Sequence, residues 1–481
     1  MATTTPTARG DLPARPGVSP SSKRAAKLAD RIVGDVMAMG WPVGELLGSE
    51  AELLERYRVS RAVFREAVRL VEHKQVARTR RGPGGGLVIT EPTVDAVIDA
   101  VVLYLYRVEA RLDELFEARI AVEEIASELA PARVDEQDLA RLRTFVEAGD
   151  TPPGRDPRAL HALLASISRN PALELFVDVL NRVAMLYSAD WQSFGPAVAA
   201  DTAYAHARIA EAVIVGEPGL ARHRMRRHLE AEAEYLRRRR STQQLLPGSV
   251  IMLSEPGNGK RAEAVARRIT QTVVSEGMQP GQLVGTEREL IEREGVSRAV
   301  LREAVRLLEH HQIARMRRGP GGGLFVFEPS AGAVTEIVAI YLARRGMCLG
   351  DLAELRTGVE VALVGLASSR IDRDGTARLR EAVEREGTSL DDDQADVVHD
   401  VHVAVAGAAH SRVLELIALV FIRLSRLYEI ERLAPRARKQ IRAEVLHAHR
   451  AIAAAVESGD RELARHRMRR HLDALAAALM R

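Results

Sequence analysis

Arginines spaced four residues apart occur in two nearly identical segments of the chain. The first segment carries Arg61, Arg65 and Arg69, and the second carries Arg298, Arg302 and Arg306. Residues four apart lie on one face of a helix, and a guanidinium group can form paired hydrogen bonds to guanine or hold a phosphate. Such a row is more often a solvated helix face, but here it occurs twice, beside a basic, Gly-rich segment. The pattern therefore predicts DNA binding, with Arg69 and Arg306 at phosphates or on the surface.

Six histidines form a second repeated set. They are His161, His206 and His228 in the first half of the chain, and His402, His449 and His471 in the second. Each group of three falls on three different predicted helices. A single helical histidine is usually a surface or core residue, but imidazole is the commonest metal ligand and helical bundles hold such sites in their interior. The repetition predicts two sites for a divalent metal, and three histidines leave tetrahedral Zn²⁺ one open position.

The arginines require a helix that is presented to the solvent by a small domain. Residues 24–39 have the apolar spacing of a helix, and Ser49 is the expected cap of a short helix that ends near Glu55. Ser60 is the expected cap of a third helix over residues 61–73. A short helix, a tight turn and a capped helix form a helix-turn-helix, whose second helix enters the major groove.

A basic hairpin follows the third helix. Residues 76–80 and 87–89 are β-prone and are joined by the segment RGPGGG, which predicts a two-stranded wing. The glycines allow the backbone to approach the minor groove closely. The wing residues that we expect at DNA in the two segments are Arg80, Arg81, Gly85, Arg317, Arg318 and Gly322.

The histidines require a different scaffold, because the remaining sequence contains little that reads as strand. The helical spacing predicts an all-α bundle after the first wing. Its helices are expected over residues 94–106, 112–129, 135–147, 157–168, 172–187, 201–215 and 219–236. The predicted fold class is therefore mainly α, with two winged helix-turn-helix domains, each followed by an all-α bundle.

An internal duplication explains why both sets of residues occur twice. VSRAVFREAVRLVEHKQVARTRRGPGGGL at 59–87 recurs as VSRAVLREAVRLLEHHQIARMRRGPGGGL at 296–324, and ARHRMRRHL at 221–229 recurs at 464–472. A unit of about 240 residues is too long for a solenoid repeat and indicates a tandem fusion of a two-domain protein. The expected parts are a disordered tail 1–22, winged helices 23–92 and 259–329, helical domains 93–240 and 330–481, and a linker 241–258.

Composition excludes several other classes of protein. The 481 residues include 4% aromatics, which argues against a β-sandwich or a base-stacking RNA platform, and the single cysteine, Cys348, excludes a disulfide scaffold. A net charge of +3 means that DNA binding must depend on local clusters. We find no apolar run that could span a bilayer and no apolar leader, so a cytoplasmic protein without membrane contact is expected.

The segments SEAELLERYRVSRAVFREAVRLVEH and TERELIEREGVSRAVLREAVRLLEH, each with its RRGPGGGL wing, resemble the winged helix of GntR-family transcription regulators. In that family the arginine of the ERE-L segment and both arginines of the SR-x-x-x-R segment contact operator DNA. The resemblance implies this role for Arg288, Arg298 and Arg302 in the second unit, and for Arg61 and Arg65 in the first. Ala51 stands where the first unit would have its equivalent of Arg288.

The helical segments resemble the FCD effector domain of the FadR subfamily. The resemblance rests on histidines in similar contexts, including Asn170-Pro171 and the repeated MRRHL strings. It implies that the three histidines and an aspartate bind a divalent metal, often Zn²⁺, beside a small carboxylate effector. The family places the aspartate four residues before the first histidine, where this chain has Pro157 and Val398. The aspartates nearest this pattern are Asp156 and Asp396.

We therefore expect a ligand-responsive transcriptional regulator, with repression as the expected effect, and not an enzyme. Its partners would be double-stranded operator DNA and a small carboxylate, and its two halves would form an intramolecular pseudo-dimer, with a further homodimer left open. A metal-dependent hydrolase is an alternative, but an enzyme needs no basic wings. An architectural DNA-binding protein without an effector is the other alternative, and the repeated histidines argue against it.

Overall fold

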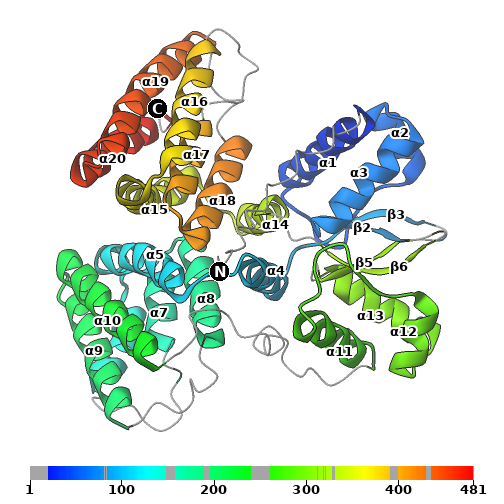
Figure 1. Cartoon of the computed structure of the whole chain (residues 1–481), viewed down its shortest axis with the longest axis horizontal. Coiled ribbons are helices and arrows are strands. Elements are labelled where there is room, and N and C mark those ends of the chain that lie inside the picture. Colours follow the sequence, from blue (N-terminus) through cyan, green and yellow to red (C-terminus); the bar gives the residue numbers. More distant parts are fainter. Residues whose placement is uncertain are drawn as a thin grey trace, which may run out of the picture. The chain divides into compact units, whose positions relative to one another are not determined.

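In the computed structural model, the described residues are 20–80, 82, 84–147, 156, 158–187, 196–239, 261–310, 313–317, 319, 321–327, 331–389, 399–428 and 435–479. The predicted tail at 1–22 lies mostly outside these ranges, and the predicted linker at 241–258 lies entirely outside them. The chain divides into two compact units, residues 1–92 and 93–481. Helices dominate the described residues, which confirms the predicted mainly α class (Figure 1).

The first unit is a three-helix domain with a small sheet. Its elements are α1 (Pro20–Ala38), β1 (Leu46–Gly48), α2 (Glu50–Tyr57), α3 (Arg61–His73), β2 (Ala77–Arg80) and β3 (Gly86–Ile89). Ser49 and Glu52 form the expected capping box on α2, and the Ser60 side chain caps α3. The domain therefore presents α3 as the second helix of a helix-turn-helix.

The sheet contains a strand that the sequence analysis missed. β1 pairs antiparallel with β3, which also pairs with β2. The two wing strands, β2 and β3, therefore belong to a three-stranded sheet of order β1-β3-β2. Three residues are too few for a recognisable alternating pattern. The pairing requires glycine at residue 86. A Cβ atom there would lie 2.3 Å from the carbonyl oxygen of Gly48 and would clash with it.

A second winged helix repeats this arrangement. Its elements are α11 (Arg261–Ser275), β4 (Leu283–Gly285), α12 (Glu287–Glu294), α13 (Arg298–His310), β5 (Ala314–Arg317) and β6 (Gly323–Val326). The sheet order β4-β6-β5 corresponds to that of the first domain. Thr286 takes the place of Ser49 as the cap of a helix with a capping box.

Each winged helix is followed by seven helices. The first bundle contains α4 (Val94–Arg107), α5 (Leu112–Arg133), α6 (Glu136–Glu147), α7 (Ala159–Ile167), α8 (Pro171–Leu186), α9 (Pro196–Ile214) and α10 (Pro218–Arg239). The second contains α14 (Ala331–Arg344), α15 (Leu349–Arg370), α16 (Arg373–Thr388), α17 (Asp400–Ala408), α18 (Arg412–Tyr428), α19 (Pro435–Glu457) and α20 (Arg461–Leu479). All seven helices expected in the first bundle are present, with bounds that differ by a few residues.

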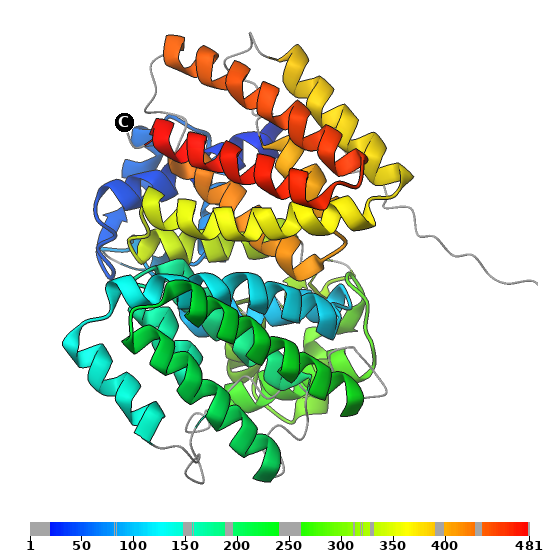
Figure 2. The same ribbon diagram turned by 90° about the vertical axis from the view of Figure 1, so that its left-hand side faces the viewer.

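The two bundles pair with each other inside the second unit. Helices α5 and α15 run side by side (Figures 1 and 2), and buried side chains of both bundles form one continuous apolar cluster. Arg133 of α5 pairs with Glu354 of α15, and Arg370 of α15 pairs with Glu117 of α5. These contacts are reciprocal, because Arg370 and Glu354 occupy in the second repeat the places of Arg133 and Glu117 in the first. The interface is thus self-complementary, as in a two-fold dimer.

Among the described residues, no helix combines the length and apolar character required to cross a membrane.

Candidate nucleic-acid interface and metal centres

The expected recognition arginines of the second winged helix lie together on the solvent side of α13. Arg298 and Arg302 are about two-thirds exposed, at 66% and 67%. Their Nε atoms lie 3.1 and 3.7 Å from the same carboxylate oxygen of Glu287, at the start of α12. Arg288 is also exposed and pairs with Glu292 over 3.0 Å. Because exposed pairs of this kind are weak, the three guanidinium groups can exchange these carboxylates for DNA.

The first winged helix presents a similar but smaller set. Arg61, Arg65 and Arg69 are exposed on α3, and Arg65 lies 3.6 Å from Glu50. Arg69 pairs with Glu66 on its own helix over 2.9 Å. Ala51 is exposed on α2 and offers no charge to a DNA backbone.

The wings contain the expected basic and glycine residues. Arg80 donates to the carbonyl of Gly84 over 2.9 Å, and the Arg317 guanidinium lies 4.2 Å from the centre of the Phe325 ring. Gly85 and Gly322 close the two turns by donating to Gly82 and Gly319. Neither is among the glycines with positive φ, which in the first wing are Gly82 and Gly84. Arg81, Arg318 and the prolines of the turns lie outside the described residues.

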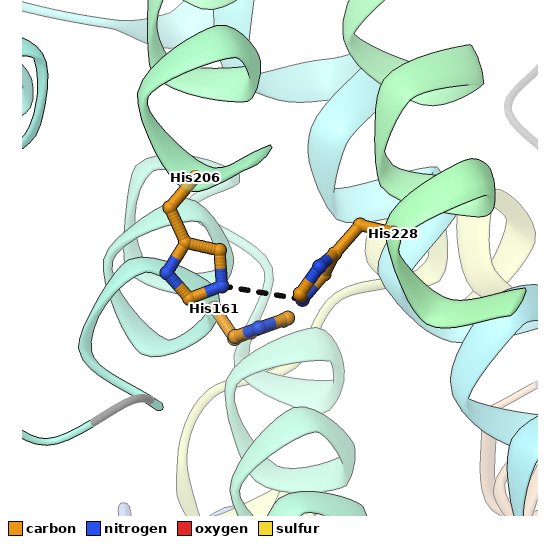
Figure 3. A group of neighbouring side chains, drawn as sticks. All are labelled: His161, His206 and His228. Atoms are coloured by element: carbon orange, nitrogen blue, oxygen red, sulfur yellow. Dashed lines mark hydrogen bonds between the residues drawn. The ribbon is translucent and has the colours of Figure 1, made fainter. Parts of the chain in front are cut away.

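The histidines of the first bundle meet in its interior. His161 comes from α7, His206 from α9 and His228 from α10, and all three side chains are buried (Figure 3). The Nε2 atoms of His206 and His228 are 3.2 Å apart, and the centres of the three rings are separated by 4.7 to 5.3 Å. One nitrogen from each ring lies within 4.8 Å of the other two, which is the arrangement required of a shared metal.

The histidines of the second bundle repeat this arrangement on α17, α19 and α20. Nε2 of His449 lies 3.1 Å from Nε2 of His402 and 3.3 Å from Nε2 of His471. Behind the rings, Nδ1 of His402 contacts Glu360 and Nδ1 of His449 contacts Glu386 over 2.7 Å. A carboxylate at Nδ1 fixes the tautomer and aims the lone pair of Nε2 at the centre of the group.

Burial favours the neutral form, which is the form that binds metal, in several of these rings by lowering their pKa. Burial lowers the pKa of His228 to about 3, with smaller contributions from the charges of His161 and Arg119. Burial likewise lowers the pKa of His449 to about 3 and that of His471 well below its usual range. His402 and His449 both face carboxylates with Nδ1, and their Nε2 atoms face each other. A cation between these two Nε2 lone pairs is therefore favourable.

A buried arginine and glutamate support each histidine group, and the sequence analysis missed both pairs. Arg119 donates from Nε to Glu123 over 2.8 Å, and Glu123 in turn contacts Nδ1 of His161. Burial alone would raise the pKa of Glu123, but Arg119 and His161 lower it to about 2. Arg356 and Glu360 repeat the pair in the second bundle, with Nε and oxygen 2.6 Å apart. The available signal was an arginine and a glutamate four residues apart at equivalent positions of the two repeats.

A cavity of about 480 Å³ opens beside the first histidine group. Several basic side chains line it, namely Arg119, Arg158, Arg208, Arg224, Arg227 and His223. The side chain of Tyr204 also lines the cavity. The cavity therefore adjoins the imidazoles, and its wall carries more basic than acidic side chains, the acidic ones being Asp201 and Glu232.

Of the two aspartates suggested as ligands, Asp156 is the one that the structure describes, and it is not brought to the first histidine group. Asp156 pairs with Arg158, with the closest atoms 2.7 Å apart, and is not part of the first group of clustered ligand atoms. Asp396 lies outside the described residues. The structure thus places three histidines at each candidate centre, and it does not place Asp156 at the first.

Comparison with protein families identifies three parts of the chain. The profile described as "FCD domain" matches residues 114–231 and 351–474, which together make up half of the chain. The profile described as "Bacterial regulatory proteins, gntR family" matches residues 261–326, the second winged helix.

Individual relatives match parts of the chain. It is 29% identical over 154 residues to the HTH-type transcriptional regulator YcbG of Bacillus subtilis, covering 32% of this chain and 64% of that protein. It is 29% identical over 125 residues to the HTH-type transcriptional regulator RmpR of Mycobacterium gastri, covering 25% and 44%. The matches thus span less than two thirds of either relative. Among solved structures, Streptococcus agalactiae GntR has 21% identity and a TM-score of 0.37, covering 45% of this chain and 99% of that one.

Proposed function

Because the chain belongs to the GntR family of bacterial regulatory proteins and carries two FCD domains, we propose that it is a repressor released from its operator by a small carboxylate. Transcription regulation, and not enzymatic activity, is the role of this family, so the hydrolase alternative is set aside. We further propose a place in the FadR subfamily, a cytoplasmic location, and the four-domain division with boundaries at 23, 93, 259 and 330.

The proposed DNA contacts are the exposed arginines of the two recognition helices and the two wings. Arg298 and Arg302 would read base edges in the major groove, and Arg288 would contact the backbone or a guanine nearby. In the first module Arg61 and Arg65 would take these roles. Arg69, Arg306 and the basic and glycine residues of the wings would hold phosphates and the minor groove.

The proposed metal ligands are the six buried histidines. The donor set fits a divalent ion such as Zn²⁺, because the Nε2 atoms converge while carboxylates hold Nδ1 of His161, His402 and His449 from behind. A metal ion there would supply a Lewis-acidic attachment point for a carboxylate. Within the chain, the histidines would orient that ion and Arg119 would keep the Glu123 carboxylate in place behind His161.

The proposed effector site is the cavity beside the first histidine group. Its wall carries Arg158, Arg208, Arg224 and Arg227 next to the imidazoles, a combination that favours a small anion over a neutral ligand. An architectural protein would have no use for a cavity of this kind, so effector control is the better explanation of this bundle.

The observation that carries the proposal is the reciprocal pairing of the two bundles within one chain. Arg133–Glu354 and Arg370–Glu117 are equivalent contacts, so one chain has the internal symmetry that other regulators need two subunits to achieve. The proposed unit of DNA binding is an intramolecular pseudo-dimer that covers two half-sites.

The test is footprinting of the full-length chain on the promoter region of its own gene, before and after chelation of metal, and with a panel of small carboxylates. A footprint of two adjacent half-sites that a carboxylate removes only in the presence of metal is the expected result. A footprint that no carboxylate affects would contradict the effector assignment, and no footprint with competitor DNA present would contradict site-specific binding.

A further inference from the structure

A carboxylate that the sequence analysis did not consider lies beside the first histidine group. Glu232 follows His228 by one helical turn on α10, and its side chain is largely buried, with 13% exposed. One of its oxygens accepts from Arg119 over 2.8 Å, and the other lies 4.0 Å from Nε2 of His228. Glu232 thus lies beside Nε2 of His228, although its oxygens are not among the ligand atoms that all lie within 4.8 Å of one another.

Other carboxylates near this group are directed elsewhere. Glu123 contacts Nδ1 of His161, on the far side of that ring, and Asp156 pairs with Arg158. Asp201 lines the cavity but is exposed on α9. Among these four carboxylates, Glu232 is the one with an oxygen near an Nε2 atom, and Arg119 holds its other oxygen in place.

The second bundle differs at this position. Leu475 follows His471 by one turn and stands where the first bundle has Glu232. The guanidinium of Arg356 donates to Glu360 and Ser425, and its Nη2 lies 3.4 Å from Nε2 of His402. Two carboxylates of the second bundle lie behind the rings: Glu360 contacts Nδ1 of His402, and Glu386 contacts Nδ1 of His449. At this centre the described residues place three imidazoles and a neighbouring guanidinium, with Leu475 in place of the glutamate.

We propose that Glu232 is the fourth protein ligand of the first metal site and that the two sites bind metal unequally. The inference rests on the metal binding proposed above. A carboxylate oxygen adds negative charge and a hard donor to three imidazoles, and its hydrogen bond to Arg119 fixes its orientation. The first site would be a three-histidine, one-glutamate centre beside the cavity, and the second a three-histidine centre.

The test uses the full-length, metal-stripped chain with Co²⁺ as the probe, read by equilibrium dialysis and by visible absorption. His449→Ala leaves the first site to be measured alone, and His206→Ala leaves the second. Glu232→Gln is made in both backgrounds, since the amide oxygen still accepts from Arg119. Glu230→Gln is the matched control, because Glu230 is exposed on the same helix and its closest charged contact is Arg226 at 4.0 Å.

In the His449→Ala background, Glu232→Gln is expected to weaken Co²⁺ binding at least tenfold and to change the absorption spectrum. In the His206→Ala background it should change neither, which also shows that the variant chain is folded. Glu230→Gln should have no effect in either. Parent-like affinity and spectrum for Glu232→Gln at the first site would overturn the inference and leave the metal site standing. Absence of Co²⁺ binding in the His449→Ala parent itself would overturn both.

Discussion

A single carboxylate lies between the two arginines proposed to read bases in the second module. Glu287 is about one-third exposed, at 34%, and lies within 4 Å of both Arg298 and Arg302. Any DNA that approaches α13 must displace it, and its negative charge opposes a phosphate backbone. The arrangement makes Glu287 a restraint on DNA binding whose removal is easily measured.

We expect Glu287→Gln to increase affinity for random-sequence DNA a few-fold, because exposed ion pairs are worth only about 0–1 kcal/mol each. The measurement is fluorescence anisotropy with random and operator duplexes at fixed salt. Glu263→Gln, which removes the same charge from α11 of the same domain, is the control for net charge. Equal gains in the two variants would mean that the pairs with Arg298 and Arg302 have no specific effect.

The two recognition arginines should contribute to sequence selectivity as well as to affinity. Arg298→Ala and Arg302→Ala are each expected to cost about 1–3 kcal/mol on operator DNA, and less on random DNA, since a base contact is lost along with a charge. Footprinting and competition binding with both duplexes measure the difference. Losses of equal size on operator and random DNA would assign these residues to phosphate contacts only.

Ala51 is expected to make the first module the weaker DNA binder. An arginine at this position, as at Arg288, can form a charge-assisted fork to a phosphate or guanine that alanine cannot. Ala51→Arg is therefore expected to strengthen binding of the fragment 23–240 to its half-site by about 1–3 kcal/mol, and so to approach the affinity of fragment 259–481. If the unmodified first fragment already binds as tightly and as selectively as the second, the proposed asymmetry is wrong.

At the scale of elements, the pairing of β1 with β3 in the first domain depends on the absence of a side chain at Gly86. Gly86→Ala places a methyl group 2.3 Å from a backbone oxygen of β1, so the strands must separate or shift. We expect a loss of about 1–3 kcal/mol in domain stability, seen as faster hydrogen exchange over residues 77–89. Gly34→Ala is the control, because a Cβ atom at Gly34 in α1 would meet nothing within 4 Å, and alanine there should stabilise the helix. Unchanged exchange in Gly86→Ala would show that β1 contributes little.

Much of the element order could be predicted because the signals are local. Ser49 and Ser60 cap their helices as predicted, and each helix of the first bundle follows an apolar period that depends only on nearby residues. The strand over Leu46–Gly48 carries no such period. Its existence depends on pairing with Leu87 and Val88, about forty residues later in the chain, and on the close approach at Gly86.

The histidine groups could be predicted from their repetition, but the residues that support them could not. Arg119 and Glu123 look in the sequence like a surface pair four residues apart on a helix, a common solvated pattern. They are buried because α5 packs against α7, α8, α10 and the second bundle, and such burial is a property of the assembled fold. Glu232 was missed for a related reason, since its position depends on the guanidinium of Arg119 from another helix.

At the scale of the whole molecule, the reciprocal contacts between the bundles predict that one chain acts as a complete DNA-binding unit. A covalent connection gives the second module an effective local concentration that a separate subunit would not have, which can raise affinity about 10²–10⁴-fold. We expect one chain per two-half-site operator, measured as the mass of the protein–DNA complex, and a binding curve without cooperativity in protein concentration.

Reversal of the charges between the two bundles tests whether their pairing lets one chain bind both half-sites. Glu117→Arg with Glu354→Arg places like charges opposite Arg370 and Arg133, so the bundles should separate. The gain in DNA affinity that the second half-site provides should then fall toward the value for two unlinked modules. Adding Arg133→Glu and Arg370→Glu restores opposite charges in reversed order and should restore most of the gain. The matched control is Glu128→Arg, which changes the same charge on α5 at an exposed residue that pairs with Arg222 within its own bundle. Two chains per operator, or a gain that survives the charge reversal unchanged, would mean that the two halves of one chain do not read the two half-sites together.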